Sequence, residues 1–296
     1  MAASDEYPKW RYLAGFAGED EAWRYVSGQG IPIANDEGAA LKSRIHHAVE
    51  LVRALPDRSA VRPDIKKMPE SAAARLAQLE ADPRSRELLQ GVQGHEWVFI
   101  ELANLRCFQQ NINSAYVETL MQRVPRPEDI NELMKFCLPL SSEREMIALP
   151  VGFNPSTNTW TIVSENLDFR LAGNVAGEAS PDPLTPQRPF VGFFYGFGSP
   201  QLSVGEYKGA YVIRNGYHRA MALLRAGHTH APVLLARLPS YQTSGGQQPG
   251  FLPPDLVLST RPPLLKDYLT EIGVDVPRRR LRVVFSAHAE VQVIGA

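Results

Sequence analysis

The sequence predicts a mixed α/β fold, and three stretches of the chain support this prediction. Apolar residues recur at helical spacing over residues 38–55, and an apolar strand leads through a turn into a helix over residues 211–227. Apolar and polar residues alternate along residues 281–294, as in a strand with one wet face. We therefore expect a mainly helical N-terminal region, residues 1–95, and a mixed-sheet domain over residues 96–296 with long loop insertions at 172–189 and 239–261.

The predicted helices have recognisable starts and ends. Leu41, Ile45 and Val49 lie about one turn apart, and Pro56 ends that pattern. Residues 20–26, 71–80 and 83–90 also predict helices, and residues 57–69 are interpreted as a loop. Further along, Ser114 is the expected N-cap of a helix over 115–123, and helices over 127–136 and 262–272 each begin with a proline.

The predicted strands are short apolar runs between turn residues. They cover residues 97–105, 146–153, 158–163, 201–204, 210–214, 231–238 and 281–294. The segments 172–189 and 239–261 have no period and are rich in glycine and proline, so we interpret both as loops. Residues 190–197 are rich in aromatic residues and glycine, and these aromatic rings either pack in the core or stack on a base.

Composition excludes several classes of protein. The chain has 296 residues, 44% hydrophobic and 21% charged, as is typical of globular proteins. Its net charge of −1 excludes a global basic field for nucleic acid but leaves a local patch possible. Two cysteines, Cys107 and Cys137, do not make a disulfide framework and are interpreted as core residues. The first ten residues are polar and no apolar run reaches about 18 residues, so we expect a cytoplasmic protein without a membrane partner.

The stretch over residues 211–227 carries the clearest chemistry. A strand ends at Arg214, Asn215 and Gly216 form a turn, and a helix begins at once. The helix turns Tyr217, Ala220, Met221 and Leu224 to one apolar face, which leaves His218 and Arg219 off that face in the first turn.

The first turn of such a helix suits an anion. Its backbone N–H groups have no acceptor within the helix, and they lie at the positive end of the helix dipole. Arg219 adds a fork of donors for phosphate oxygens, and His218 adds a donor that exchanges a proton near neutral pH. The sequence therefore predicts a phosphate site built from Asn215, Gly216, Tyr217, His218 and Arg219, with His218 and Arg219 as the catalytic candidates.

The same stretch resembles the ParB/sulfiredoxin-like family over residues 210–236. Asn-Gly-Tyr-His-Arg-Ala-Met-Ala, followed by a turn and a Pro-Val strand, matches the family's element at Gly216, His218, Arg219, Ala222 and Pro232-Val233. The resemblance implies a mixed sheet with helices and binding of nucleotide phosphates, with ATP or CTP as cofactor candidates and Mg²⁺ as an accompanying ion. Family members include partition proteins that bind CTP, an ATP-using sulfinic-acid reductase, a free-serine kinase and nucleases.

The chain also departs from the family pattern. Sulfiredoxin has a cysteine just before the His-Arg pair, and here that residue is Tyr217, which argues against the reductase chemistry. The usual acidic residue before the glycine is Asn215 here. Only about seventy residues follow the motif, and they read as loop, helix and strand, so the helix-turn-helix domain of a partition protein is not expected.

Other residues are weaker candidates for function. Arg278, Arg279, Arg280 and Arg282 form a basic cluster that is either a solvated loop or a phosphate contact. His228 and His230 have a spacing compatible with a metal, but no third ligand is visible, and His46-His47 is interpreted as packing or surface. Glu165, Asp168 and Glu206 are the carboxylates that could hold Mg²⁺ or act as a base.

Three functions remain open at this point. The first is a nucleotide- or phosphate-binding protein, with or without phosphoryl transfer or hydrolysis. The second is a metal-dependent nuclease or nucleic-acid binder, which needs a carboxylate next to His218 or the Arg278–Arg282 cluster. The third is a non-catalytic scaffold or sensor, which should expose an apolar patch. Oligomeric state, nucleotide identity and pathway are not encoded in any pattern we find.

Overall fold

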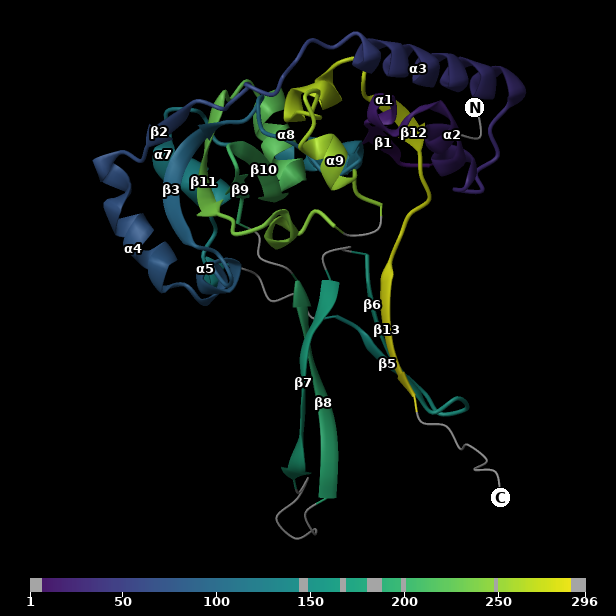
Figure 1. The fold of residues 1–296 in the computed structure, drawn as a ribbon. Helices are drawn as coiled ribbons and strands as arrows, with labels where there is room; N and C mark the ends of the chain where they lie inside the picture. Colours follow the sequence, from purple (N-terminus) through teal and green to yellow (C-terminus); the bar gives the residue numbers. More distant parts are fainter. Residues whose placement is uncertain are drawn as a thin grey trace. The chain divides into compact units, whose positions relative to one another are not determined.

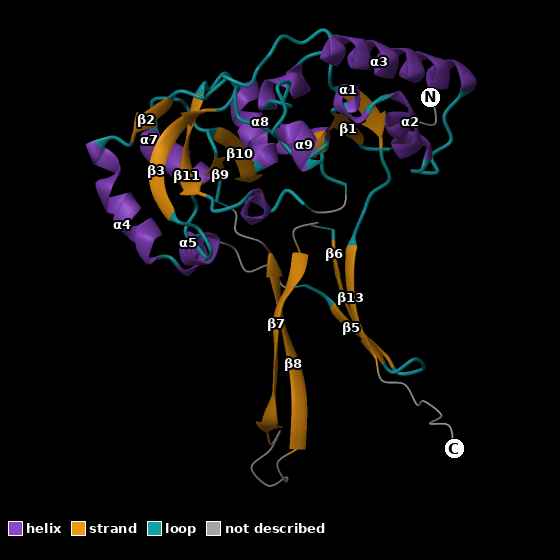
Figure 2. Cartoon of the chain, viewed as in Figure 1, coloured by secondary structure: helices purple, strands orange, loops and turns teal. Residues whose placement is uncertain are grey.

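The chain forms both helices and mixed or antiparallel sheets, which confirms the mixed α/β class (Figures 1 and 2). The computed structural model describes residues 7–143, 149–165, 169–179, 188–197, 201–247 and 250–288. The chain divides into two units: unit 1 comprises Met1–Arg144 and Ser199–Arg279, and unit 2 comprises Glu145–Gly198 and Arg280–Ala296. In the described part of the chain, no helix combines the length and the apolar composition that crossing a bilayer requires.

Unit 1 is built on a five-stranded mixed sheet with the strand order β10-β9-β11-β3-β2 (Figure 1). Its strands are β2 (Ile65–Lys67), β3 (Gly94–Glu101), β9 (Ser203–Tyr207), β10 (Ala210–Asn215) and β11 (His230–Arg237). The central strand β11 runs parallel to β9 and antiparallel to β3, with Leu235 opposite Val204 on one side and Glu96 on the other. Six consecutive residues of β11, Ala231 to Ala236, are buried, which explains their unbroken apolar run.

Helix α8 (Tyr217–Arg225) connects β10 to β11 and covers the core of this sheet. It packs against α6 (Ser114–Met121), while α7 (Ile130–Cys137) contacts β11. The remaining helices of this part of unit 1 are α4 (Ala73–Ala81), α5 (Pro83–Leu88) and α9 (Pro254–Val257). One large hydrophobic cluster joins these elements, with Leu223, Val212 and Val233 fully buried in it.

A second, smaller sheet of unit 1 contains both ends of that unit. It has the order β12-β1-β4, formed by β1 (Lys9–Tyr12), β4 (Asn111–Asn113) and β12 (Val274–Pro277), all antiparallel. Beside it lie α1 (Ala14–Ala17), α2 (Glu19–Ser27) and the long α3 (Asn35–Arg53). Trp10, Leu41 and Val276 belong to one buried cluster, so residues distant in sequence share this core.

Unit 2 contains two sheets. The first has the order β13-β6-β5 and consists of β5 (Val151–Asn154), β6 (Thr159–Ser164) and β13 (Val283–His288). The second is a hairpin of β7 (Phe169–Ala179) and β8 (Arg188–Phe197). Both are antiparallel, and the turn predicted at residues 154–157 joins β5 to β6.

Several sequence-based boundaries differ from the structure. The predicted loop over residues 172–189 is wrong where the structure describes it, since β7 and β8 occupy residues 169–179 and 188–197, and residues 180–187 lie outside the described part. The two strands are held by their backbone hydrogen bonds to each other, and these bonds leave no periodic pattern in a glycine-rich sequence. The segment 239–261 contains a short 3₁₀-helix, Tyr241–Ser244, and α9 (Pro254–Val257), and the predicted helix over 262–272 is a 3₁₀-helix over Leu265–Leu269.

The predicted division at residue 95 also differs from the observed units. β1 pairs with β4 and β12, and β2 pairs with β3, so the first 95 residues add strands to sheets that the later chain completes. Helix α6 is capped by the Asn113 side chain rather than by Ser114, and α7 begins after Asp129 rather than at Pro127. In both cases an Asx carboxylate or amide oxygen accepts a first-turn N–H.

Candidate phosphate site at the start of helix α8

Gly216 makes the sharp turn between β10 and α8. Its φ of 93° and ψ of 23° lie in the left-handed region that favours glycine. A Cβ at this position would stand 2.7 Å from Leu202 Cδ1 and 3.2 Å from Leu202 Cα, so a side chain does not fit. The turn therefore requires glycine for two independent reasons, and it lets α8 begin directly after the strand. The first-turn N–H groups of α8 follow at once, as the sequence predicts.

Asn215 holds this turn against the preceding segment. Its side-chain amide donates to the carbonyl oxygen of Gln201 at 3.0 Å, and the Gln201 side chain in turn bonds the Ser85 hydroxyl. The pairing of β10 with β9 is irregular between Ile213 and Asn215. Asn215 therefore has a positioning contact in this structure, at the place where the strand stops and the helix starts.

Tyr217 belongs to the core. Its side chain is 4% exposed, and its ring packs against that of Phe108 with 5.5 Å between centroids. The hydroxyl accepts the N–H of Phe108 at 2.9 Å and donates to the carbonyl of Ile213 at 2.9 Å. Burial raises the pKa of this phenol well above its ordinary value. The side chain of Tyr217 is therefore engaged in the core and does not face a ligand.

His218 ties α8 to the start of α6. Its Nε2 accepts the backbone N–H of Asn113 at 3.1 Å, and its ring meets the Tyr116 ring with 5.2 Å between centroids. Burial lowers the pKa of His218 to about 4. An Nε2 that accepts an N–H carries no proton, so the ring is neutral at pH 7 with its proton on Nδ1. The sequence predicts that His218 donates a proton. In this structure its Nε2 instead accepts a hydrogen bond.

Arg219 lies beside the C-terminal end of α7. Its guanidinium carbon is 5.6 Å from the centroid of the Phe136 ring, within the range of a cation–π contact. Burial raises the pKa of the neighbouring Cys137 thiol to about 12, and the positive charge of Arg219 acts in the opposite direction. A cation near the last turn of α7 is also favourable for the dipole of that helix. Arg219 therefore starts from the first turn of α8 and brings its positive charge to the C-terminal end of α7.

Of the three carboxylates expected near His218, only Glu206 belongs to the same unit of the chain. Glu206 pairs with Tyr211 in the β9–β10 ladder, and Tyr211 lies four residues before Asn215, the last residue of β10. At a rise of about 3.3 Å per residue, Glu206 is therefore roughly 13 Å from the end of the strand that leads into α8. Its Oε1 accepts the N–H of Gly209 in the hairpin turn. Glu165 belongs to unit 2, and Asp168 lies outside the described residues.

The basic cluster predicted at Arg278–Arg282 is divided in the structure. Arg278 stacks on Trp10 with 4.2 Å from its guanidinium carbon to the ring centroid, and it donates to the Asn111 side chain at 2.8 Å. Arg279 donates to the Gly30 carbonyl at 2.6 Å. Arg280 and Arg282 are exposed and belong to unit 2. The first two arginines therefore contact the N-terminal part of the protein.

The predicted histidine pair at the end of α8 also has internal partners. His228 Nε2 bonds the Pro125 carbonyl oxygen at 3.0 Å, and His230 Nε2 bonds Asp64 at 3.0 Å. Among the described residues, the one group of three or more side chains arranged to share a metal is Glu19, His46 and Glu50, which sequence spacing alone did not reveal. Glu19 lies 27 residues before His46, so only the packing of α2 on α3 brings them together.

Two cavities lie near α8, and neither is lined by residues 215–219. One, of about 310 Å³, is lined by Arg11, Ser114, Met221 and Arg225 among others. In it Arg225 pairs with Glu118 at 2.6 Å, and Arg11 pairs with Asp275 at 3.4 Å. The other, of about 380 Å³, lies beside the turn that follows α8. A ligand at the first turn of α8 would thus bind at the partly exposed Gly216, His218 and Arg219 rather than in either cavity.

Comparison with protein-family models, with curated proteins and with solved structures finds no match to this chain.

Proposed function

We propose that this protein binds the phosphate of a nucleotide, or of another phosphate ester, at the first turn of α8. The observation that carries the proposal is the turn at Gly216, where a left-handed glycine with no space for a side chain starts a helix directly after a strand. The first N–H groups of a helix that begins in this way have no acceptor within the helix, and an anion binds readily there. The similarity of residues 210–236 to the ParB/sulfiredoxin-like element supports the same assignment.

In this proposal each residue has a separate role. Gly216 and the backbone N–H groups that follow it hold the phosphate oxygens, and Arg219 supplies positive charge. Asn215 positions the turn through Gln201, and Tyr217 anchors the helix in the core through Phe108 and Ile213. ATP and CTP are the nucleotides to test first, with Mg²⁺ as the ion that would accompany their phosphates.

The site is proposed to bind the phosphate without transferring it. His218 is neutral, and its Nε2 is engaged by the N–H of Asn113, so it does not act as a general acid at that nitrogen. Phosphoryl transfer relies on metal ions held by carboxylates or similar ligands. In the described part of the chain, no group of metal-binding side chains includes His218. A binding protein, such as a nucleotide-dependent sensor, therefore accounts for the geometry better than a kinase or a nuclease.

The test is a ligand titration of the full chain with ATP, CTP, GTP and inorganic phosphate, each with and without Mg²⁺. A ligand that binds only the folded state stabilises it by about 2.7 kcal/mol at 100 times its dissociation constant, which thermal unfolding detects. We expect one nucleotide to stabilise the wild type and Arg225→Gln, whose arginine pairs with Glu118 at the other end of α8, but not Arg219→Gln. A wild type that responds to none of these ligands, or an Arg219→Gln variant that responds as strongly, would overturn the proposal.

Turnover is measured separately on the same samples. We expect no release of inorganic phosphate from the stabilising nucleotide over hours. If phosphate is released, and His218→Gln abolishes the release while leaving binding intact, the binding site stands and the claim that it does not transfer phosphate is wrong.

A second candidate function, an interaction protein, is favoured by one specific observation in unit 2. Trp160, Phe153 and Val151 are 53%, 45% and 51% exposed, and they lie on one face of the β13-β6-β5 sheet. Exposed apolar faces of this kind mark sites of protein association. The simplest form to test is self-association, by light scattering of the wild type and of Trp160→Ser. A monomeric wild type at all concentrations would exclude a second copy of this chain as the partner.

A further inference from the structure

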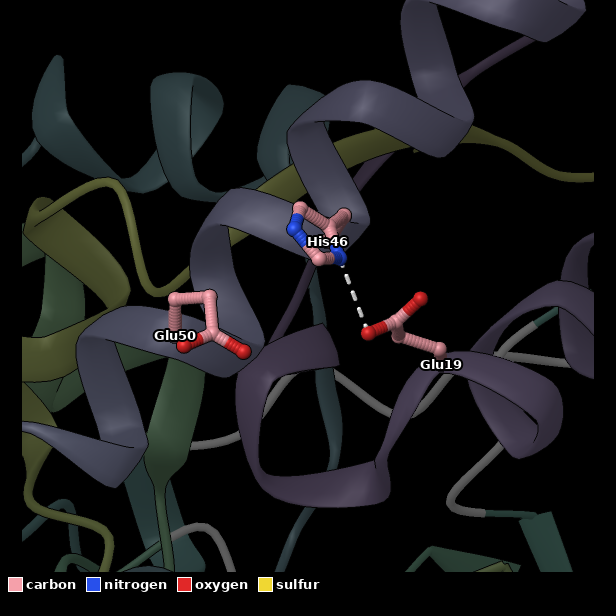
Figure 3. A group of neighbouring side chains, drawn as sticks. All are labelled: Glu19, His46 and Glu50. Atoms are coloured by element: carbon pink, nitrogen blue, oxygen red, sulfur yellow. Dashed lines mark hydrogen bonds and ion pairs between the residues drawn. The ribbon is translucent and has the colours of Figure 1, made fainter.

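Glu19, His46 and Glu50 converge on the surface of unit 1, where α2 meets α3 (Figure 3). His46 and Glu50 are four residues apart on α3 and so lie on the same side of that helix. Glu19 is the first residue of α2 and reaches His46 from the neighbouring helix, with 2.9 Å between its Oε1 and the His46 Nδ1. One ligand atom from each of the three side chains lies within 4.8 Å of the other two.

The two helices that carry these residues are fixed by the core beneath them. Ala22 and Val26 on α2, and Ile45 and Ala48 on α3, are buried in one hydrophobic cluster. Close packing also pins α1 to α3, since a Cβ on Gly15 would stand 2.4 Å from the Ala48 carbonyl oxygen. Glu19, His46 and Glu50 therefore lie at the edge of a packed interface between helices. The hydrophobic core fixes the backbone positions of these three residues, and their own side-chain contacts are not needed for it.

The chemistry of the three donors is that of a transition-metal site. An imidazole nitrogen with two carboxylates is a ligand set that suits zinc and similar divalent ions. Bonds of about 2.0–2.2 Å in a tetrahedral site place donors roughly 3.4 Å apart. The present separations, up to 4.8 Å, require only side-chain rotations of exposed residues to reach that value. Three protein ligands leave the fourth position for water.

The geometry points to a divalent transition-metal site, of the zinc class, at Glu19, His46 and Glu50. The ion takes the place of the hydrogen bond between His46 and Glu19, and it links α2 to α3 across 27 residues of chain. One cation already competes for the site, because Arg53 forms an ion pair with the Oε1 of Glu50. Metal binding therefore requires Glu50 to turn from Arg53 toward His46, or to use its other oxygen.

The same helix supplies a matched control. His47 is the next residue, is similarly exposed, and bonds a single carboxylate, that of Glu271, at 3.1 Å. It belongs to no group of three metal-binding side chains among the described residues. Replacing His47 removes an exposed histidine of the same helix without touching the proposed ligands.

The experiment is a calorimetric titration of Zn²⁺ into tag-free full chain that has been treated with chelator and desalted. We expect one Zn²⁺ per chain, with the dissociation constant raised at least about tenfold in His46→Gln, Glu19→Gln and Glu50→Gln, since even changes outside the ligand shell weaken metal sites by that much. His47→Gln should bind as the wild type does. Arg53→Gln should bind more tightly, because it frees Glu50 and removes a positive charge.

Glu50→Gln should weaken Zn²⁺ binding, whereas Arg53→Gln should strengthen it. These opposite effects distinguish a Glu50 that binds the metal from a Glu50 that only pairs with Arg53. If Glu50→Gln and Arg53→Gln weaken binding alike, Glu50 is not a ligand and the assignment is wrong. If Zn²⁺ does not bind the wild type, or binds His46→Gln with unchanged affinity, the site does not exist as proposed. Mg²⁺, which prefers oxygen ligands, should bind much more weakly than Zn²⁺. Equal binding of both ions would show a general acidic surface and overturn the proposal.

Discussion

The two units hold their strands in different ways. In unit 1, six consecutive residues of β11 are buried between neighbours on both sides. In unit 2, all four residues of β5 are exposed, and Val191 of β8 is 63% exposed. The strands of unit 1 are therefore stabilised by a core, whereas those of unit 2 depend more on backbone pairing. A two-stranded hairpin such as β7–β8 is only marginally stable by itself, so we expect unit 2 to tolerate changes that unit 1 does not.

The largest expected difference between the two units is the loss of unfolding free energy when a glycine is replaced by alanine. Gly216→Ala should lower the free energy of unfolding by about 3 kcal/mol, because the left-handed backbone costs an L-residue about 1–2 kcal/mol and the clash with Leu202 adds overpacking. Gly227→Ala, at the other end of α8, has a similar φ of 90° but no atom within 4 Å of its new Cβ, so only about 1 kcal/mol is expected. Gly152→Ala in unit 2 should stay within about 0.5 kcal/mol.

Urea denaturation of the three variants measures these differences. A Gly216→Ala variant no less stable than Gly227→Ala would mean that Leu202 moves aside at little cost, and that the turn into α8 is not set by the packing described above. The proposed phosphate site would then lose the turn geometry on which it depends.

The second expected difference between the two units is the loss of unfolding free energy when a tyrosine hydroxyl is removed. Tyr217→Phe leaves the N–H of Phe108 and the carbonyl of Ile213 without their buried partner, and should cost about 2–3 kcal/mol. Tyr195→Phe in unit 2 removes a hydroxyl from a side chain that is 40% exposed, and should cost almost nothing. The same denaturation measurement applies. Equal effects would contradict the claim that Tyr217 is a core residue rather than a ligand contact.

In unit 1, the sequence predicted the strand, turn and helix around Gly216 well, but it missed a strand at the N-terminal end of the unit. The strand, turn and helix over residues 210–225 are present nearly as predicted, because a glycine turn, an apolar face and a buried strand each leave a local pattern. β1 was missed although Trp10 and Tyr12 are buried and alternate with Lys9 and Arg11. Four residues are too short for the period to stand out, and the strand exists because β4 and β12 flank it.

The candidate site shows the same limit. Sequence placed Gly216 to Arg219 correctly at the start of a helix, whereas Asn215, predicted in the turn, is the last residue of β10. Sequence could not show that Tyr217 bonds Phe108 or that His218 accepts a bond from Asn113. Those partners lie more than a hundred residues away in the chain. The trio of Glu19, His46 and Glu50 was missed for a related reason, since its third ligand comes from a different helix.

The pH dependence of stability tests the protonation state of His218. Its pKa in the folded protein is lowered to about 4, below the value near 6.5 of an exposed histidine. The unfolded chain therefore takes up the proton first as the pH falls, so the stability contributed by neutral His218 is complete above about pH 6.5 and is lost toward pH 4. Between pH 7 and pH 5 the loss should be about 1.8 kcal/mol.

Two variants isolate this contribution. His218→Gln keeps an acceptor for the Asn113 N–H but cannot titrate, so its stability should fall less between pH 7 and pH 5 than that of the wild type. His47→Gln removes an exposed histidine and should keep the wild-type dependence. If His218→Gln and the wild type have the same pH profile, His218 is not held neutral by burial, and a proton-donating role becomes tenable.

The smallest expected effect lies in unit 2. Phe153 and Trp160 face each other across β5 and β6, with 4.6 Å between ring centroids, yet both are about half exposed. Phe153→Ser should therefore cost less than about 1 kcal/mol, the value of an aromatic pair.

Fluorine NMR of 5-fluorotryptophan-labelled protein measures this locally, because Trp160 reports on unit 2 and the buried Trp10 on unit 1. The Trp160 resonance should shift in Phe153→Ser while the urea midpoint of the Trp10 resonance stays unchanged. A midpoint that falls for Trp10 as well would show that exposed aromatic residues of unit 2 support the core of unit 1. In that case the contrast between a strand held by burial and a strand held by pairing would not describe this protein.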